Sequence, residues 1–172
     1  MATTLYEATV ERFVQTLGGV AGFLERGLAH CADSGVEAKT LVEARLWDDM
    51  LPLSFQIVSV AHHSLGAIEG ARQGVFSPSS RESRSYDQLQ ALVASSRETL
   101  QGMDRDEINA LEGRPVLFKV GEREISFDAQ GFLLSFSLPN FYFHAATAYD
   151  ILRSQGVPLG KRDFIGQLRT KS

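Results

Sequence analysis

Apolar residues recur at steps of three, four or multiples of these in the first 31 residues, as on one face of an α-helix. Thr4 precedes the pattern and Glu7 follows three residues later, which predicts a capping box at the start of this helix. Three glycines interrupt the pattern, and we expect neighbouring backbone to pack closely against them. The apolar positions are Leu5, Phe13, Leu17, Val20, Leu24, Leu28 and Cys31, and the glycines are Gly18, Gly19 and Gly22.

A second long helix is expected after Pro52, because a proline is tolerated in the first helical turn. Before it, residues 33–35 break the chain and residues 37–46 are expected to form a short connecting helix. The apolar face of the second helix runs over residues 53–68, with His62 and His63 in its middle. Neighbouring helical residues point about 100° apart, so at most one of these imidazoles can point squarely into a site. The pattern places His63 nearer to Val60 and leaves open which of the two faces a cleft.

Residues 74–85 are mostly polar and are expected to form an exposed loop. Ser85 is the expected N-cap of a third long helix, and a short helical turn over residues 104–111 follows it. Each long helix needs a partner for its apolar face, so the pattern predicts a helical bundle. The apolar face of the third helix consists of Leu89, Leu92, Val93, Ser96, Leu100 and Met103.

The spacing of apolar residues changes to two in the next segment, which predicts strands over residues 116–120 and 125–127 joined by a turn at Gly121 and Glu122. A third strand is expected over residues 132–138. A last long helix is then expected over residues 138–153, with Pro139 in its first turn and Gly156 at its end. The fold class predicted by the residues is therefore mainly α, with a small β-hairpin or meander inserted before the last long helix.

The last helix carries the candidate functional site. His144 lies one turn after Asn140 and about one turn before Tyr149, so an imidazole, an amide and a phenol can share a strip of its surface. Tyr142 is a further candidate donor to a substrate oxygen. After Gly156, the tail is expected to be extended and to pack through apolar residues.

Length and composition limit the class of protein. A chain of 172 residues with 44% hydrophobic residues is expected to form a single domain over residues 1–172. A net charge of -4 gives no basic surplus for binding nucleic acid. The single Cys31, the absence of a signal-peptide pattern and the lack of any apolar run of about 20 residues favour a cytoplasmic protein without a membrane partner.

Several catalytic motifs are absent from the sequence. It contains no Gly-x-Ser-x-Gly, no phosphate-binding glycine loop and no dinucleotide-binding fingerprint. Acyl hydrolases, nucleotide hydrolases and nicotinamide-dependent enzymes are therefore disfavoured.

Three segments carry a resemblance to a known family: residues 138–153 with their Pro-Asn-Phe-Tyr-Phe-His run, residues 50–56 with His63 seven residues later, and residues 156–161. Together they resemble the bacterial domain of unknown function DUF1993, which is grouped with the DinB/YfiT-like proteins, a superfamily described as metalloenzymes. The resemblance implies a four-helix bundle in an up-down-down-up arrangement, a homodimer, and a divalent metal in the better understood relatives.

In those metal-binding relatives, the second helix supplies one histidine and the last helix supplies two, one turn apart. His63 and His144 match two of the three, while Asn140 and Ala148 stand one turn from His144 where the other would be. Zn²⁺ in catalytic sites normally takes three protein ligands. A carboxylate is an alternative third ligand if the metal is Fe or Mn. Ni is a further candidate for the metal. The carboxylates considered are Asp48, Asp49 and Asp150.

Two functions remain open. One is a small-molecule or partner-binding bundle with a degenerate metal site, in which an Asn, a Tyr or a backbone carbonyl holds His144. The other is a divalent-metal-dependent enzyme of the transferase or hydrolase type that uses His63 and His144. The structural alternatives are that these histidines are hydrogen-bonded core residues, that Tyr142 and Tyr149 belong to the core, and that Asn140 caps the helix.

Overall fold

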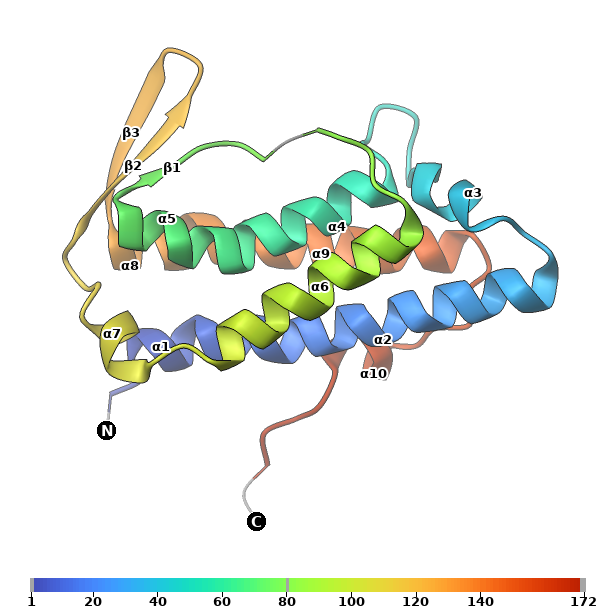
Figure 1. Cartoon of the computed structure of the whole chain (residues 1–172), viewed down its shortest axis with the longest axis horizontal. Coiled ribbons are helices and arrows are strands. Elements are labelled where there is room, and N and C mark those ends of the chain that lie inside the picture. Colours follow the sequence, from blue (N-terminus) through green and yellow to red (C-terminus); the bar gives the residue numbers. More distant parts are fainter. Residues whose placement is uncertain (1, 80, 171–172) are drawn as a thin grey trace.

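The first predicted helix forms as α1 (Leu5–Ala8) and α2 (Val10–Ser34), which appear in blue in Figure 1. The computed structural model describes residues 2–79 and 81–170. The capping box is confirmed, because the Thr4 hydroxyl accepts a hydrogen bond from the Glu7 N–H and the Glu7 carboxylate accepts one from the Thr4 N–H. The helix ends at Gly35, whose φ of 73° lies in the left-handed region that glycine adopts without strain.

The second helical stretch contains the two adjacent histidines. It begins after the short helix α3 (Ala38–Glu43) and consists of α4 (Leu53–Ala61), the π-helical turn η1 (His62–Gly66) and α5 (Ala67–Gln73). The π-helical turn widens the helix at His62 and His63. The second long helix predicted from the sequence is therefore confirmed, with a π-helical turn in its middle.

The third helix is α6 (Tyr86–Gln101), and α7 (Arg105–Asn109) follows it. Ser85 caps α6 as predicted, with its hydroxyl accepting from the Gln88 N–H. The preceding loop over residues 74–85 is not wholly irregular, because β1 (Val75–Phe76) forms within it; residue 80 of this loop lies outside the described residues.

The predicted hairpin consists of β2 (Pro115–Val120) and β3 (Arg123–Asp128), paired antiparallel from Pro115 opposite Asp128 to Val120 opposite Arg123. β1 adds to β2 in the parallel direction, with Phe76 opposite Phe118. The sheet order is therefore β1-β2-β3, and its third strand comes from the polar loop.

The third strand predicted over residues 132–138 is wrong. This segment is helical and comprises α8 (Ala129–Gly131) and the π-helical turn η2 (Phe132–Ser137), which lead directly into α9 (Leu138–Ser154). The Asp128 carboxylate caps this helix by accepting from the Gly131 N–H. Phe132 and Phe136, one turn apart, stack with ring centroids at 5.8 Å, so helical spacing rather than alternation buries this run.

The tail also differs from the expected extended segment. Residues Lys161–Ile165 form the short helix α10, which packs on α2. The Asp163 carboxylate accepts from the Gly160 N–H at the start of this helix. The local cap therefore makes a helical turn where an extended chain was predicted.

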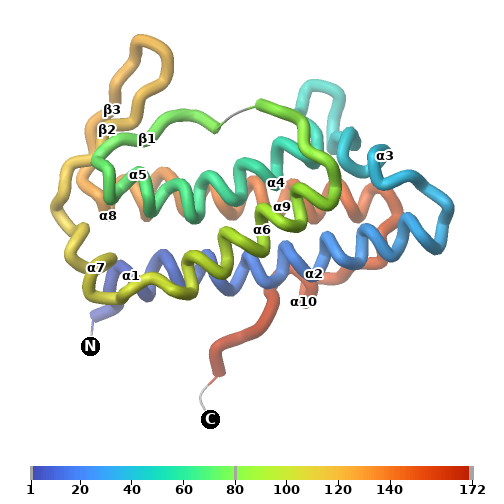
Figure 2. The backbone as a smooth tube through the Cα atoms, viewed as in Figure 1, coloured from blue at the N-terminus to red at the C-terminus, as the bar shows by residue number. Residues whose placement is uncertain are grey.

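The long segments pack around one connected hydrophobic core. α4 packs mainly against α9 and α2 against α6, and the stretch between α9 and α10 follows α2 (Figure 2). Phe13 of α2 meets Phe141 of α9 with ring centroids at 4.9 Å. The protein is therefore mainly helical, with a small three-stranded sheet at one end. No helix in the described part of the chain has the length and apolarity needed to cross a membrane.

Candidate functional site

Two helical stretches bring His63 and His144 together. His63 lies on η1 and His144 on α9, with ring centroids 5.8 Å apart and ring planes only 14° apart. Two imidazoles that bind one metal at about 2.1 Å have ring centroids separated by a distance of this order. The same separation allows both rings to contact one small molecule. The structure therefore places His63 beside His144, a point that the sequence left open.

His62 points elsewhere. Its Nε2 lies 2.7 Å from the carbonyl oxygen of Ser77, and its ring stacks on Phe76 with centroids at 4.3 Å. Burial lowers the pKa of His62, and the hydrogen bond to Ser77 acts in the opposite direction. His62 therefore ties the loop after β1 to η1, and His63 is the member of the pair that faces α9.

A buried glutamine fixes the orientation of His144. The side chain of Gln56 is 3% exposed, and its Nε2 donates to the carbonyl oxygen of Leu51 at 2.8 Å. Because that carbonyl can only accept, the Oε1 of Gln56 faces His144 and accepts from its Nδ1–H at 2.8 Å. The neutral ring of His144 thus carries its proton on Nδ1, and Nε2 presents a lone pair.

His63 has a buried polar atom without a partner. Its Nδ1 is inaccessible to solvent and makes no hydrogen bond to any described residue. The ring lies among aromatic side chains, with Phe76 and Phe136 each at 5.6 Å between centroids. Most buried polar atoms in native proteins are paired, so an unpaired one calls for an explanation.

Both histidines of the pair are held in the neutral state. Burial, and to a smaller extent repulsion by the nearby His62 and His144, together lower the pKa of His63 to about 3. Burial lowers the pKa of His144 to about 4. Neutral imidazoles can accept a proton or a hydrogen bond, or ligate a metal, at neutral pH.

Within the described part of the chain, the other predicted site residues make no hydrogen bond or ring contact with His144. Tyr149 packs against Phe23 of α2 and Phe164 of α10, whereas His144 faces α4. Tyr142 is 36% exposed and makes an edge contact with Phe141.

Asn140 does not cap a helix start, because the helix already begins at Ala129. Its Nδ2 donates to the carbonyl oxygen of Phe136 at 2.7 Å, one turn earlier in η2. The amide therefore serves the backbone of the π-helical turn that precedes α9.

The described residues do not form a three-ligand metal set. Among the described residues, no group of three His, Cys, Asp or Glu side chains is placed to hold one metal ion. Asp48 and Asp49 lie exposed in the turn before α4, and Asp150 lies exposed on α9. The suggestion that one of these carboxylates completes the set is therefore wrong.

Sequence reasoning missed Gln56 as the partner of His144 and expected an Asn, a Tyr or a backbone carbonyl instead. A usable signal existed, because Gln56 lies seven residues before His63, which is about two helical turns and hence the same face. The aromatic surroundings were also missed, because Phe76 comes from the segment read as a loop and Phe136 from the segment read as a strand.

A pocket of about 300 Å³ borders this site. Its lining includes Phe55, Leu51 and Arg45. The ring of Phe55 also contacts that of His144, with centroids at 5.9 Å, and Leu51 supplies the carbonyl that orients Gln56. A small molecule in this pocket would therefore be close to the residues that position His144.

Comparisons with known proteins agree with this fold. The family model described as "Domain of unknown function (DUF1993)" matches residues 5–165. A solved structure of a DinB family member from Shewanella denitrificans is similar, with a TM-score of 0.79, 24% sequence identity and coverage of 98% of this chain and 95% of that one. No curated protein gives a significant match. At this level of identity, the likeness to the solved structure concerns the fold alone.

Proposed function

The chain belongs to the family described as a domain of unknown function (DUF1993), and for this member we propose a small-molecule-binding function centred on His63 and His144. The observation that carries the proposal is the relay from Leu51 through Gln56 to His144. It fixes the His144 proton on Nδ1 and leaves the lone pair of Nε2 available. The ligand that suits this atom carries a hydrogen-bond donor.

The surroundings define the rest of the ligand. Phe55 and Phe143 contact the ring of His144, while Phe76 and Phe136 contact that of His63. Aromatic walls bind an apolar body, and two neutral imidazoles give no charge to attract an ion. The proposed ligand is therefore a small uncharged molecule with a hydroxyl or thiol donor.

The proposal is tested by titrating the protein with phenol at pH 7 and following the side-chain nitrogens of histidine by NMR. We expect saturable changes in the Nε2 shift of His144 and in the nitrogen shifts of the neighbouring His63, and His144→Phe should abolish the change at His63. The matched control is His30→Phe, a histidine at the far end of α2, which should leave the change intact. A phenol titration that moves no nitrogen of His63 or His144 would contradict the proposal.

A divalent-metal-dependent enzyme is the second candidate, and one observation favours it. Histidines that bind metals usually donate their other ring N–H to an oxygen acceptor, as His144 does to Gln56. His63 and His144 are the two side chains that would hold Zn, Ni, Fe or Mn. Two imidazoles fall short of the usual three protein ligands, so the donor set fits such an ion only in part.

Metal titration separates the two candidates. The binding proposal predicts that added Zn²⁺ binds no tighter to the protein than to His144→Ala. Stoichiometric Zn²⁺ or Ni²⁺ that is lost on His144→Ala would instead support the metal-dependent enzyme.

The up-down-down-up arrangement and the homodimer are further parts of the proposal. The arrangement is supported by the direction of the chain colours along α2, α4, α6 and α9 in Figure 1.

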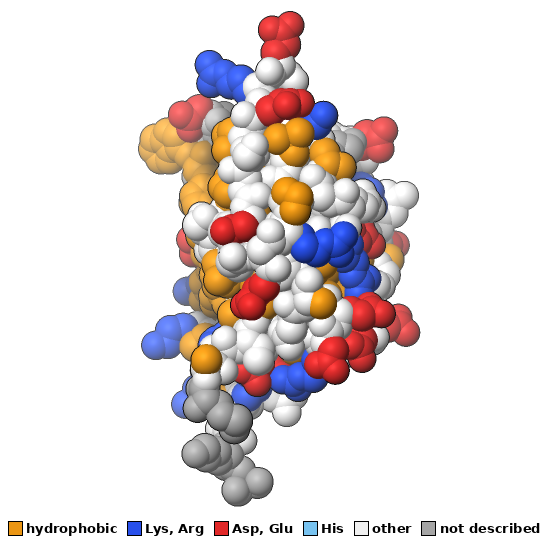
Figure 3. Space-filling view, turned by 90° about the vertical axis from the view of Figure 1, so that its left-hand side faces the viewer, with side chains coloured by type: hydrophobic (Ala, Val, Ile, Leu, Met, Phe, Trp, Pro, Cys, Tyr) orange, Lys and Arg blue, Asp and Glu red, His pale blue; other side chains and the backbone are white. Residues whose placement is uncertain are grey.

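The homodimer is supported by exposed apolar side chains, such as Phe143 at 58% exposure and Leu134 at 40%. Hydrophobic side chains also gather along one edge of the end view (Figure 3). Sedimentation equilibrium should give twice the mass of one chain; the mass of a single chain at micromolar concentration would contradict the homodimer.

A further inference from the structure

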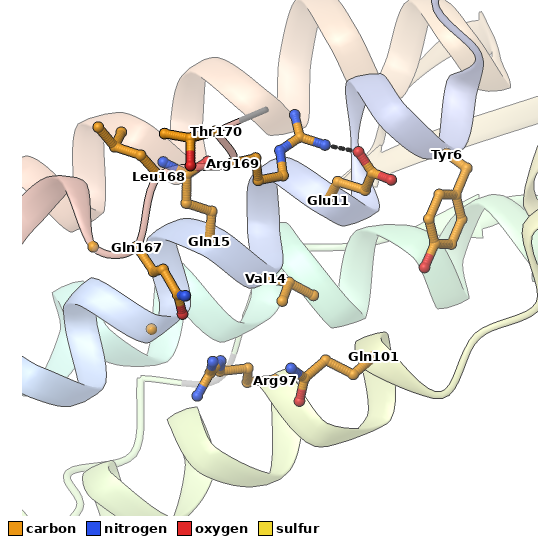
Figure 4. Close-up of a pocket in the computed structure, with 12 residues that line it drawn as sticks. Tyr6, Glu11, Val14, Gln15, Arg97, Gln101, Gln167, Leu168, Arg169 and Thr170 are labelled. Carbon is orange, nitrogen blue, oxygen red and sulfur yellow. Dashed lines mark ion pairs between the residues drawn. The ribbon is translucent and has the colours of Figure 1, made fainter. Parts of the chain in front are cut away.

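A polar groove lies between α2, α6 and the C-terminal segment, apart from the histidine pair. It has a volume of about 830 Å³. Figure 4 shows Arg97 and Gln101 of α6 on one side, facing α2 and the C-terminal residues on the other. None of the residues that contact His63 or His144 lines this groove, so it is a separate feature of the fold.

Arg97 is the unusual side chain of the groove. It is half-buried, and its Nε is inaccessible to solvent without a hydrogen-bond partner among the described residues. The guanidinium group lies flat along α2 at Gly18, where a Cβ would be 3.6 Å from each of its Cζ, Nε and Nη2 atoms. Within the described part of the chain, no carboxylate forms an ion pair with it. A half-buried guanidinium group whose charge has no partner among the described residues is costly unless another group completes it.

The carboxylate of the groove is already occupied. Glu11 forms an ion pair with Arg105 at 3.1 Å and a second with Arg169 of the C-terminal segment, which is drawn as a dashed line in Figure 4. Two arginines compensate this one acid, so Glu11 is not available to Arg97. Arg97 therefore presents a positive charge to the groove that none of the described residues neutralises.

Amide side chains flank this charge. Gln101 lies one turn after Arg97 on the same helix, and Figure 4 shows the two side chains next to each other. Gln15 donates to the carbonyl oxygen of Ile165, which holds the C-terminal segment across the groove. Val14 and Leu168 add apolar surface to the lining. The groove thus combines one cation, amide donors and an apolar wall.

From this combination we propose that the groove binds a small organic monocarboxylate through the guanidinium group of Arg97. The planar fork of an arginine matches a carboxylate through two parallel hydrogen bonds. A single unpaired cation balances one negative charge, which favours a carboxylate over a phosphate dianion. The amide of Gln101 donates to the same carboxylate, and the apolar body of the ligand lies along Val14.

The test is calorimetric titration with sodium benzoate, sodium acetate and inorganic phosphate at constant ionic strength. We expect saturable binding of the two carboxylates, with benzoate tighter than acetate and phosphate weaker than both. Arg97→Gln should weaken benzoate binding by at least about tenfold, the loss expected for charge-assisted hydrogen bonds. Arg97→Lys keeps the charge but not the fork, and should retain only part of the affinity.

Arg123→Gln is the matched control, because it removes the same charge from an exposed position at the start of β3. This variant and His144→Phe should bind benzoate as the unmodified protein does, which separates this groove from the histidine site. Thermal unfolding confirms that each variant is folded before titration. Absence of benzoate binding, or equal binding by folded Arg97→Gln, would overturn the proposal. Tighter binding of phosphate than of benzoate would overturn the assignment to a carboxylate.

Discussion

Two side chains on the π-helical turns bury polar atoms that have no partner among the described residues, the Nδ1 of His63 on η1 and the Oγ of Ser137 on η2. π-Helical turns inside α-helices are frequent at functional sites. Here they lie on the two stretches that bring His63 and His144 together. Buried polar atoms without a partner lower the stability of the folded protein. In native proteins such atoms call for an explanation, and a functional role is one.

This cost can be measured at Ser137. We expect Ser137→Ala to leave the free energy of unfolding unchanged or to raise it by up to about 1 kcal/mol, because it removes a buried hydroxyl that has no partner. Ser64→Ala is the matched control, since Ser64 is equally buried on η1 but donates to the carbonyl oxygen of Val60 at 2.7 Å. The control should lose about 1 kcal/mol in urea unfolding. Equal losses in the two variants would show that Ser137 is satisfied in solution.

At the scale of single residues, the sequence predicted His63 and His144 but not the network around them. Helical spacing indicates which residues share a face of one helix, which marked His144, while His63 was selected over His62 by the resemblance to the family. It does not indicate which faces of different helices meet. Tyr149 therefore fell on the predicted strip but packs toward α2 and α10, while Gln56 on another helix holds His144.

Glycines of α2 determine how the C-terminal helix docks. A Cβ at Gly19 would fall on the carbonyl oxygens of Phe164 and Asp163, and backbone cannot move aside as a flexible side chain does. A Cβ at Gly22 would meet no heavy atom within 4 Å. The close approach of backbone predicted for the glycine cluster is thus confirmed at Gly19, whereas Gly18 faces the Arg97 side chain and Gly22 open space.

These two positions give opposite predictions within one helix. Gly19→Ala should destabilise the protein by about 1 to 3 kcal/mol, because it forces α10 away from α2. Gly22→Ala should stabilise it by about 0.5 to 1 kcal/mol, because alanine favours the helix and nothing obstructs it. Thermal and urea unfolding measure both changes. A loss of stability in Gly22→Ala equal to that in Gly19→Ala would contradict the docking of α10 on Gly19 of α2.

At the scale of elements, long amphipathic patterns and caps were reliable. Thr4 and Ser85 start helices as predicted, and the hairpin forms around Gly121. Short apolar runs were not reliable, because residues 132–138 fit both alternation and helical spacing. The two-residue strand β1 could not be predicted, since its pairing with β2 depends on contacts distant in sequence.

For the whole molecule, the buried histidines make stability depend on pH. The pKa of His63 is lowered to about 3 and that of His144 to about 4, against about 6.5 in the unfolded chain. Below about pH 6.5, these histidines therefore bind protons in the unfolded state but not in the folded state. The free energy of unfolding falls as the pH falls. This contribution is fully present above pH 6.5 and decreases down to the folded pKa values. His62, whose pKa is also lowered, acts in the same direction.

We expect the free energy of unfolding to fall by about 2 to 4 kcal/mol between pH 7 and pH 5, a range in which most carboxylates stay ionised. In His63→Phe the fall should be smaller by about 1 to 2 kcal/mol, because one titrating group is removed. Urea unfolding at both pH values gives the comparison. Equal stability at pH 7 and pH 5 would indicate that the histidines are charged or solvated in the folded protein.

The most direct test of the central claim, a neutral imidazole pair with an open His144 Nε2, is the side-chain ¹⁵N NMR spectrum of the histidines between pH 5 and pH 8. The structure predicts that His144 carries its proton on Nδ1, bonded to Gln56, with Nε2 bare. It also predicts that neither His63 nor His144 titrates with a midpoint above pH 5. A proton on Nε2 of neutral His144, or a midpoint near pH 6.5 for either residue, would contradict the account.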